Sequence, residues 1–207
     1  SGMKPLILLA LLLPLAAGAQ VRVPPQPDAP PKGEGAPKPG LNSRDVAYAR
    51  SLVLYEDEEV LALNKPSGLA VQGGTKTPRH VDRLLSAWGE GSTRPRLVHR
   101  LDRDTSGLMV FARDLHSQRH LSKQFELRQV DKTYQALALG VLHGEGQIDV
   151  PVRYDPLHPP LHVADPDHPK PALTHWQALD QHLLAGQTVT RVLLSPHTGR
   201  SHQLRVH

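Results

Sequence analysis

The densest group of reactive side chains lies between His99 and Ser106. Two Asp, two Arg, a His, a Thr and a Ser occupy these eight residues. The apolar pair Leu97-Val98 precedes the group, and Leu108-Met-Val-Phe111 follows Gly107, so the pattern predicts two strands that flank a tight polar loop. A solvated charged turn would have the same composition. A polar cluster between apolar strands is also where a rigid scaffold presents chemistry.

Asp102 is the strongest candidate for chemistry within that loop. Arg100 and Arg103 are its neighbours in the sequence, and a guanidinium beside a carboxylate favours the charged form. An ionised and positioned carboxylate can act as a nucleophile or a base. Asp102 and Asp104 could also form a pair of carboxylates for an exported hydrolase, which the sequence leaves open as an alternative.

Tyr134, in Lys132-Thr-Tyr134, is the second candidate. A half-buried strand tyrosine is the ordinary interpretation of this residue. The functional interpretation is a flat ring on which a nucleic-acid base stacks, with a phenol that can move a proton. Lys132 is two residues away in an expected strand, so it is predicted on the same face of the sheet.

A third cluster runs from Thr198 to His207 and contains Arg200 and Arg205. It is either a basic surface segment or a site in which one guanidinium binds a carboxylate and the other binds phosphate. His197, His202 and His207 recur every five residues, a spacing that suits neither a helical i,i+4 pair nor one face of a strand. With no Cys in the chain, we expect no metal site.

The composition of the chain limits the classes of protein to which it can belong. The 207 residues allow one sizeable domain with extensions, and 20 Pro indicate that part of the chain is extended. The net charge of +4 favours an anionic partner, with nucleic acid first. The absence of Cys excludes a disulfide framework and thiolate chemistry.

The N-terminal region reads differently from the rest of the chain. Met3-Lys4 is followed by an apolar run over residues 6–17 and a small-residue stretch at 18–20, the pattern of a secretory signal that is too short to span a membrane. Residues 24–40 are rich in Pro and Gly and predict a semi-rigid linker. Ser1-Gly2 ahead of the Met indicates a tag remnant or a fragment, and the pattern at the C-terminus is unfinished.

Hydrophobic periodicity and turn residues predict the elements. Helices are expected over 42–50, over 79–88 with Val81, Leu84, Leu85 and Trp88 buried, and from an N-cap at Asp114 to about residue 128. The buried side of that last helix is expected to include Leu115, Leu121, Phe125 and Leu127. Strands are expected over 52–55, 60–63, 69–71, 130–139, 147–152, 173–179 and 188–194, the last two as a hairpin, with a loop over 155–171.

Four segments together resemble a known family. Asn64-Lys-Pro-Ser-Gly68, His99–Gly107, Lys132-Thr-Tyr134 and Thr198–His207 occur in the order found in the RluA/RluC-type pseudouridine synthases, and the resemblance covers residues 52–207. Residues 18–25 resemble the end of the S4 RNA-binding domain in the RluC-like branch. The resemblance therefore implies three parts: a signal-like or artefactual segment at 1–19, a remnant of the S4 domain and its linker at 20–46, and a C-terminally incomplete catalytic domain at 47–207.

The resemblance also implies a fold and an activity. The implied fold is α+β, with a mixed, mainly antiparallel sheet, flanking helices and a central cleft. The implied reaction is the isomerisation of uridine to pseudouridine in structured RNA without a cofactor or metal, by a cytoplasmic monomer. Export remains the alternative if residues 3–19 act as a signal peptide. By similarity Asp102 is the catalytic carboxylate, Tyr134 stacks on the target base, and Arg205 pairs with Asp102.

The remaining expected contacts are with the RNA. Arg100 is expected to occupy the space that the flipped uridine leaves. Lys65, Lys132 and Arg200 are expected to contact phosphates, and His99 belongs to the same RNA-binding set, although it can also hold the shape of the loop. The front half of the chain favours 23S large-subunit rRNA as the substrate. tRNA, a dual tRNA/rRNA specificity and an RNA-binding fragment without turnover are the alternatives.

Overall fold

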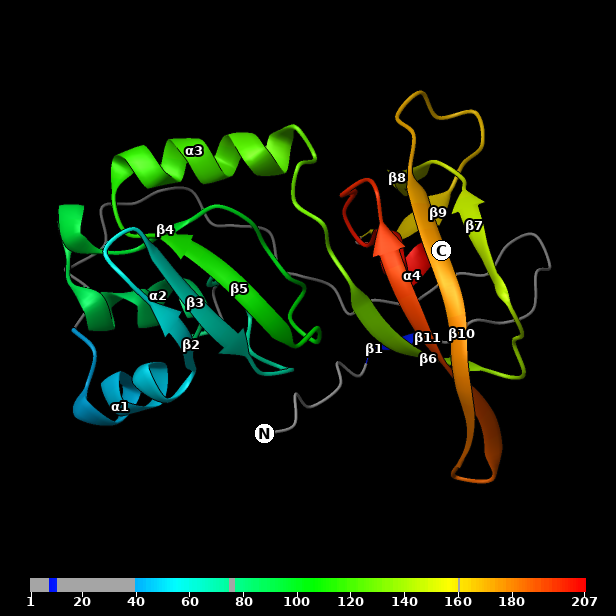
Figure 1. Ribbon diagram of the computed structural model, residues 1–207, viewed down its shortest axis with the longest axis horizontal. Coiled ribbons are helices and arrows are strands. Elements are labelled where there is room, and N and C mark those ends of the chain that lie inside the picture. Colours follow the sequence, from blue (N-terminus) through cyan, green and yellow to red (C-terminus); the bar gives the residue numbers. More distant parts are fainter. Residues whose placement is uncertain (1–7, 11–39, 75–76, 160) are drawn as a thin grey trace. The chain divides into compact units, whose positions relative to one another are not determined.

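A computed structural model describes residues 8–10, 40–74, 77–159 and 161–207 (Figure 1). The chain divides into two compact units. The loop unit is Pro27–Gln129, and the hairpin unit combines Ser1–Gln26 with Val130–His207. Most of the signal-like segment and of the Pro-rich linker lies outside the described residues.

The loop unit is built on a four-stranded antiparallel sheet of order β2-β3-β5-β4. Its strands are β2 (Val53–Glu56), β3 (Val60–Lys65), β4 (Arg96–Leu97) and β5 (Gly107–Ala112). The central strand β3 buries Leu61, Ala62 and Leu63 in succession, so side chains on both of its faces are covered. Leu61 pairs with Phe111 and Leu63 with Met109, which places four fully buried side chains in the middle of the sheet.

The helices of the loop unit agree in part with the expected ones: the first and third α-helices begin where the sequence places them, and the second begins two residues later. They are α1 (Ser43–Ser51), α2 (Val81–Leu84), the 3₁₀ turns η1 (Leu85–Trp88) and η2 (Gly91–Thr93), and α3 (Leu115–Glu126). Asn42 caps α1 by accepting a bond from the Asp45 backbone N–H, and Asp114 caps α3 in the same way. The helix expected over 79–88 is split between α2 and η1, and its four predicted apolar residues are all buried.

Two expectations for the loop unit are wrong. Residues 69–71 form no strand, because the carbonyls of Ala70 and Val71 accept bonds from the backbone N–H groups of Val81 and Asp82 at the start of α2. The segment thus satisfies its backbone on a helix end instead of a neighbouring strand. On α3, Leu115 and Leu127 are 49% and 53% exposed, because they lie at the ends of the helix.

The hairpin unit contains a five-stranded sheet of order β1-β6-β11-β10-β7. These strands are β1 (Leu8–Ala10), β6 (Tyr134–Leu139), β7 (Glu145–Asp149), β10 (Leu173–Leu184) and β11 (Gln187–Pro196). β1 pairs with β6 in parallel, and the other pairs are antiparallel. A two-stranded sheet of β8 (Val152–Tyr154) and β9 (His162–Ala164) and the short helix α4 (Gln203–Val206) complete the described part.

The β10–β11 hairpin dominates this unit and projects beyond the other strands in Figure 1. It was expected over 173–194 and is longer than expected. Its turn residues Ala185 and Gly186 have φ values of 48° and 79°. Two successive positive φ values match the twist of a two-residue hairpin turn. Ala136, Ala138 and Val192 form the core beneath β6 and β11.

The fold class is α+β with mixed, mainly antiparallel sheets, as expected. The loop expected over 155–171 is wrong in part, because His162 in β9 pairs with Tyr154 in β8. The strand expected from residue 130 begins only at Tyr134. The expected central cleft stays a prediction.

Candidate functional site

The buried side chain of Lys65 holds the loop that carries Asp102 in place. The Lys65 side chain is 1% exposed, and its Nζ donates bonds to the carbonyls of Pro66 (3.0 Å), Leu69 (2.8 Å) and Arg103 (2.9 Å). Arg103 follows Asp102 directly, so the ammonium joins the segment after β3 to the candidate catalytic loop. The first and second segments of the family resemblance are thus packed against each other.

Three further bonds join the same two segments. The Gly68 N–H donates to the Arg103 carbonyl (2.9 Å), and the Arg103 Nε donates back to the Gly68 carbonyl (3.1 Å). The Ser67 hydroxyl donates to the Asp104 carbonyl (2.8 Å). Within the loop, the Thr105 N–H donates to the Asp102 carbonyl (3.2 Å). The backbone from Asp102 to Thr105 is therefore fixed, and the half-buried Asp102 side chain lies on a positioned turn.

The expected contact between Lys65 and phosphate is replaced by this structural role. The three bonds use every N–H of the ammonium, and the side chain does not reach the surface. Burial lowers the pKa of Lys65 to about 8, while the carboxylates of Asp104 and Asp102 act in the opposite direction. The ammonium is still the main form at pH 7, so Lys65 contributes a positive charge near the Asp102 carboxylate.

His99 fixes the other end of the loop. Its Nε2 accepts a bond from the Val110 backbone N–H (2.9 Å), which assigns the proton of the neutral ring to Nδ1. The ring stacks on Phe125 of α3 with centroids 4.5 Å apart and planes at 16°. His99 therefore ties the loop to β5 and α3, whereas Arg100, the next residue, is exposed. The expected RNA contact of His99 stays a prediction.

In the hairpin unit, Tyr134 is the first residue of β6 and pairs in register with Leu194 of β11. Its side chain is half-buried. The Lys132 Nζ lies 4.0 Å from the position that a Cβ would occupy on Gly199. The third and fourth segments of the resemblance thus meet within this unit, beside a residue that has no side chain.

Gln203 holds the turn between Thr198 and α4 and was not among the residues predicted to have a role. Its buried side chain accepts bonds at Oε1 from the Thr198 hydroxyl (2.7 Å) and the Arg200 N–H (3.0 Å). Its Nε2 donates to the Leu173 carbonyl (3.0 Å) and the Thr174 hydroxyl (3.0 Å). All four bonding positions of the amide are satisfied. The available signal in the sequence was an amide that is followed by two apolar residues, Leu204 and Val206.

Arg200 and Arg205 depend on that turn for their positions. The Arg200 Nε donates to the Pro171 carbonyl (2.9 Å), so part of its guanidinium holds the start of β10. Arg205 is half-buried on α4, between Gln203 and His207. His207 contacts the Thr174 hydroxyl (2.8 Å) and the Val150 carbonyl (2.8 Å), and burial lowers its pKa. The helix that carries Arg205 is thus anchored at both ends.

The structure gathers the candidates into two groups. Asp102, Arg100, His99 and Lys65 belong to the loop unit. Tyr134, Lys132, Arg200 and Arg205 belong to the hairpin unit. The pairing of Arg205 with Asp102 joins residues of different units and stays a prediction.

The three regularly spaced histidines lie in different surroundings. His197 contacts the ring of His175, His202 contacts the ring of His162, and His207 bonds Thr174. Among the residues that the structure describes, no group of three or more His, Asp or Glu side chains has the arrangement of a metal site.

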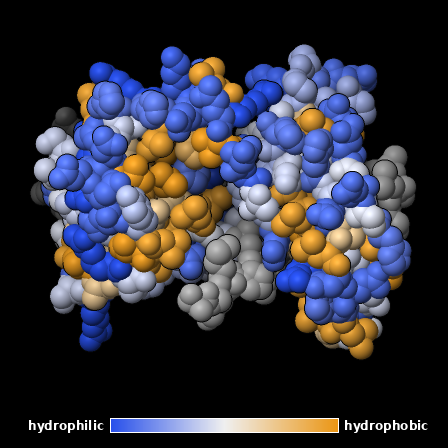
Figure 2. Space-filling model, in the orientation of Figure 1, coloured by the Kyte–Doolittle hydropathy of each residue, from blue (hydrophilic) through white to orange (hydrophobic). Residues whose placement is uncertain are grey.

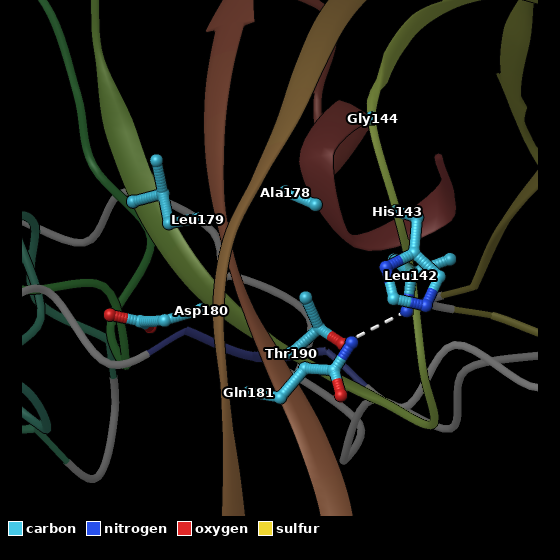
Figure 3. A pocket seen from close by; sticks show the side chains of 8 residues that line it. All are labelled: Leu142, His143, Gly144, Ala178, Leu179, Asp180, Gln181 and Thr190. Atoms are coloured by element: carbon cyan, nitrogen blue, oxygen red, sulfur yellow. Dashed lines mark hydrogen bonds between the residues drawn. The ribbon is translucent and has the colours of Figure 1, made fainter.

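A cavity of about 320 Å³ lies in the hairpin unit and includes none of the candidate residues (Figure 3). It opens beside the irregularity between Ala178 and Asp180 in β10. The Thr190 hydroxyl accepts a bond from the Leu142 N–H in its wall (3.0 Å) and donates to the Gly140 carbonyl (2.8 Å). The Asp180 carboxylate forms an ion pair with Arg191. The Thr190 hydroxyl and the Asp180 carboxylate of this wall are therefore engaged in bonds within the hairpin unit.

Comparison with known proteins gives consistent matches. A family model described as RNA pseudouridylate synthase matches residues 59–207. The dual-specificity RNA pseudouridine synthase RluA of Vibrio vulnificus (strain CMCP6) is 40% identical over 157 residues, which cover 75% of this chain and 62% of the relative. The ribosomal large subunit pseudouridine synthase C of the same strain is 38% identical over 194 residues, which cover 93% of this chain and 59% of the relative.

A solved structure agrees with these matches. Human RNA Pseudouridylate Synthase Domain Containing 1 has a TM-score of 0.65 and 28% identity, over 75% of this chain and 62% of that chain. The chain spans about three fifths of the length of the curated relatives named above. Within the described residues, no helix has the length and apolar content needed to cross a bilayer.

Proposed function

The chain belongs to the RNA pseudouridylate synthase family, and from this premise we propose that it converts uridine to pseudouridine in structured RNA. The observation that carries the proposal is the family match over residues 59–207. That span contains all four segments that could supply chemistry, at 64–68, 99–107, 132–134 and 198–207. The net charge of +4 suits a polyanionic substrate.

We propose Asp102 as the catalytic carboxylate. In the reaction the N1–C1′ bond of uridine breaks, the uracil turns, and a C5–C1′ bond forms. C5 loses a proton and N1 ends protonated, so the product is an isomer of the substrate and no cofactor is consumed. The anchoring of the loop by Lys65 supports this role, because a carboxylate on a fixed turn loses little freedom on reaching the reacting atoms.

Tyr134 and Arg205 are proposed to complete the chemistry. The Tyr134 ring would stack on the target base, and its phenol would assist removal of the C5 proton. Arg205 would pair with Asp102 and keep the carboxylate ionised, which the opposite charges of the two residues support.

The other candidates are proposed to hold the RNA. A uridine that leaves its stack costs a few kcal/mol, and Arg100 would offset part of that by filling the vacated space. Its exposure supports this role. Lys132 and Arg200 would contact phosphates beside Gly199, where the absent side chain leaves room for a backbone to approach.

We propose 23S large-subunit rRNA as the substrate and the cytoplasm as the place of reaction. The relative named for the ribosomal large subunit aligns with 93% of this chain, whereas the dual-specificity relative aligns with 75%. The 40% identity of that second relative makes dual specificity, with tRNA as a further substrate, the second candidate.

The test uses unmodified large-subunit rRNA transcribed in vitro. The purified chain is incubated with it, and pseudouridine is mapped by carbodiimide-blocked primer extension. We expect conversion at specific uridines in the wild type and none above background with Asp102→Asn, while RNA binding is retained. Asp104→Asn is the matched control, and it should keep most of the activity because Ser67 bonds the Asp104 backbone carbonyl.

Each contrary result has a definite meaning. Conversion that survives Asp102→Asn would refute the catalytic assignment. RNA binding by the wild type without conversion would show that the chain is an RNA-binding fragment without turnover. Conversion of tRNA at a comparable rate would establish dual specificity.

A further inference from the structure

The outer face of α3 carries a stripe of basic side chains. His116, Arg119, His120 and Lys123 lie at positions i, i+3, i+4 and i+7, which places them on one side of the helix. All four are exposed, and we call them the α3 stripe. In Figure 2 the edge of the molecule where α3 lies is mainly hydrophilic.

The opposite face of α3 attaches the helix to the candidate catalytic loop. Ser117 is buried there, and Leu121 and Phe125 are half-buried. The Phe125 ring stacks on His99, which precedes Asp102 by three residues. The α3 stripe and the candidate catalytic loop therefore belong to one compact unit, and the opposite face of α3 packs against that loop.

The two full charges of the α3 stripe, on Arg119 and Lys123, are in no ion pair with an acid within the described part of the chain. Four other arginines of the loop unit do form ion pairs: Arg50 and Arg113 with Glu56, Arg79 with Asp45, and Arg94 with Asp82. The one acid within α3, Glu126, is its last residue, and Asp114 before it is bonded to Ser117.

We propose that the α3 stripe binds the phosphate backbone of the RNA substrate outside the catalytic loop. The inference rests on the proposed function, because that function supplies the polyanion. Guanidinium and ammonium groups form charge-assisted bonds with phosphate, and the two imidazoles add N–H donors. Phosphate contacts position a nucleic acid without reading its sequence. The stripe thus sets how the RNA lies on the loop unit while the loop acts on one uridine.

The test compares two double variants with the same loss of charge. Arg119→Gln/Lys123→Gln removes the two full charges of the α3 stripe. Arg44→Gln/Lys170→Gln removes two exposed charges that lie elsewhere. Dissociation constants for in vitro transcribed, unmodified large-subunit rRNA are measured by filter binding at 50, 100 and 200 mM KCl. Thermal melting followed by circular dichroism checks that both variants fold.

The stripe variant should raise the dissociation constant roughly tenfold or more at 100 mM salt. It should also make the rise of log Kd with log salt less steep, by about 1 to 2 in the slope. Turnover at saturating RNA should be unchanged while KM rises. An equal loss in the control variant would reduce the effect to net charge and overturn the proposal, as would an unchanged slope. Binding is read without turnover, so a wild type that binds RNA but forms no pseudouridine counts against the proposed function alone.

Discussion

Lys65 shows how one buried charge can organise the candidate catalytic loop. The ammonium gives three bonds to backbone carbonyls, one of them next to Asp102 in the sequence. A buried charge is tolerated only when it is fully bonded, and here each N–H has an acceptor. Lys65, which the sequence predicted to contact phosphate, therefore supports the backbone of the loop. If Asp102 has the proposed role, loss of Lys65 should lower activity by displacing Asp102.

The lowered pKa of Lys65 gives a prediction for stability. Between pH 8 and 10.5 the unfolded chain binds more protons at this position than the folded chain, so the free energy of unfolding rises with pH across that window. The wild type should gain up to about 3 kcal/mol over Lys65→Met between pH 8 and 10.5. Urea unfolding followed by Trp88 fluorescence, with Trp176→Phe in both proteins, measures this gain. A difference that stays constant up to pH 10 would contradict it.

At the scale of elements, the stability of α4 depends on side-chain bonds at its two ends. The helix has four residues, too few to be stable by its own hydrogen bonds. Gln203 bonds four partners at its start, and His207 bonds Thr174 and Val150 at its end. Arg205 lies between these anchors, so its position is set by β10 and by the turn at Thr198.

Gln203→Leu should therefore destabilise the hairpin unit. It keeps the bulk of the side chain but leaves buried partners unbonded, which costs about 2–4 kcal/mol. Urea unfolding followed by Trp176 fluorescence measures the loss. Gln177→Leu, at an exposed position on β10, is the matched control and should change stability by less than about 0.5 kcal/mol. Equal effects of the two substitutions would show that the amide network contributes little.

At the scale of the molecule, the two units have unequal cores. The loop unit fully buries large side chains on neighbouring elements, among them Leu61, Leu85, Met109 and Phe111. Among the described residues of the hairpin unit, the core cluster consists of Ala136, Ala138 and Val192, with the partly buried Leu142, Leu194 and Leu204 packed against it. Burial of apolar area is the main favourable term in folding, so the smaller side chains contribute less.

Two unfolding transitions should follow from this difference. In urea, Trp176 in the hairpin unit should report a lower midpoint than Trp88 in the loop unit. Each signal can be isolated with the other tryptophan changed to Phe, since the chain has only two. Coincident midpoints would show that the units unfold as one cooperative body.

The resemblance to a known family implied the α+β class. The sequence by itself determined the N-cap at Asp114, the β10–β11 hairpin and the loop that carries Asp102. These features follow from local rules: a side chain that caps its own helix, a turn between two apolar runs, and the alternation of a strand. The tertiary structure alone decided that residues 69–71 support a helix start, that Lys65 is buried and that Gln203 holds α4. Each of these depends on partners distant in the sequence. A lysine or glutamine has the same local pattern in solvent as in a core, and only the carbonyls that fold around it decide between the two.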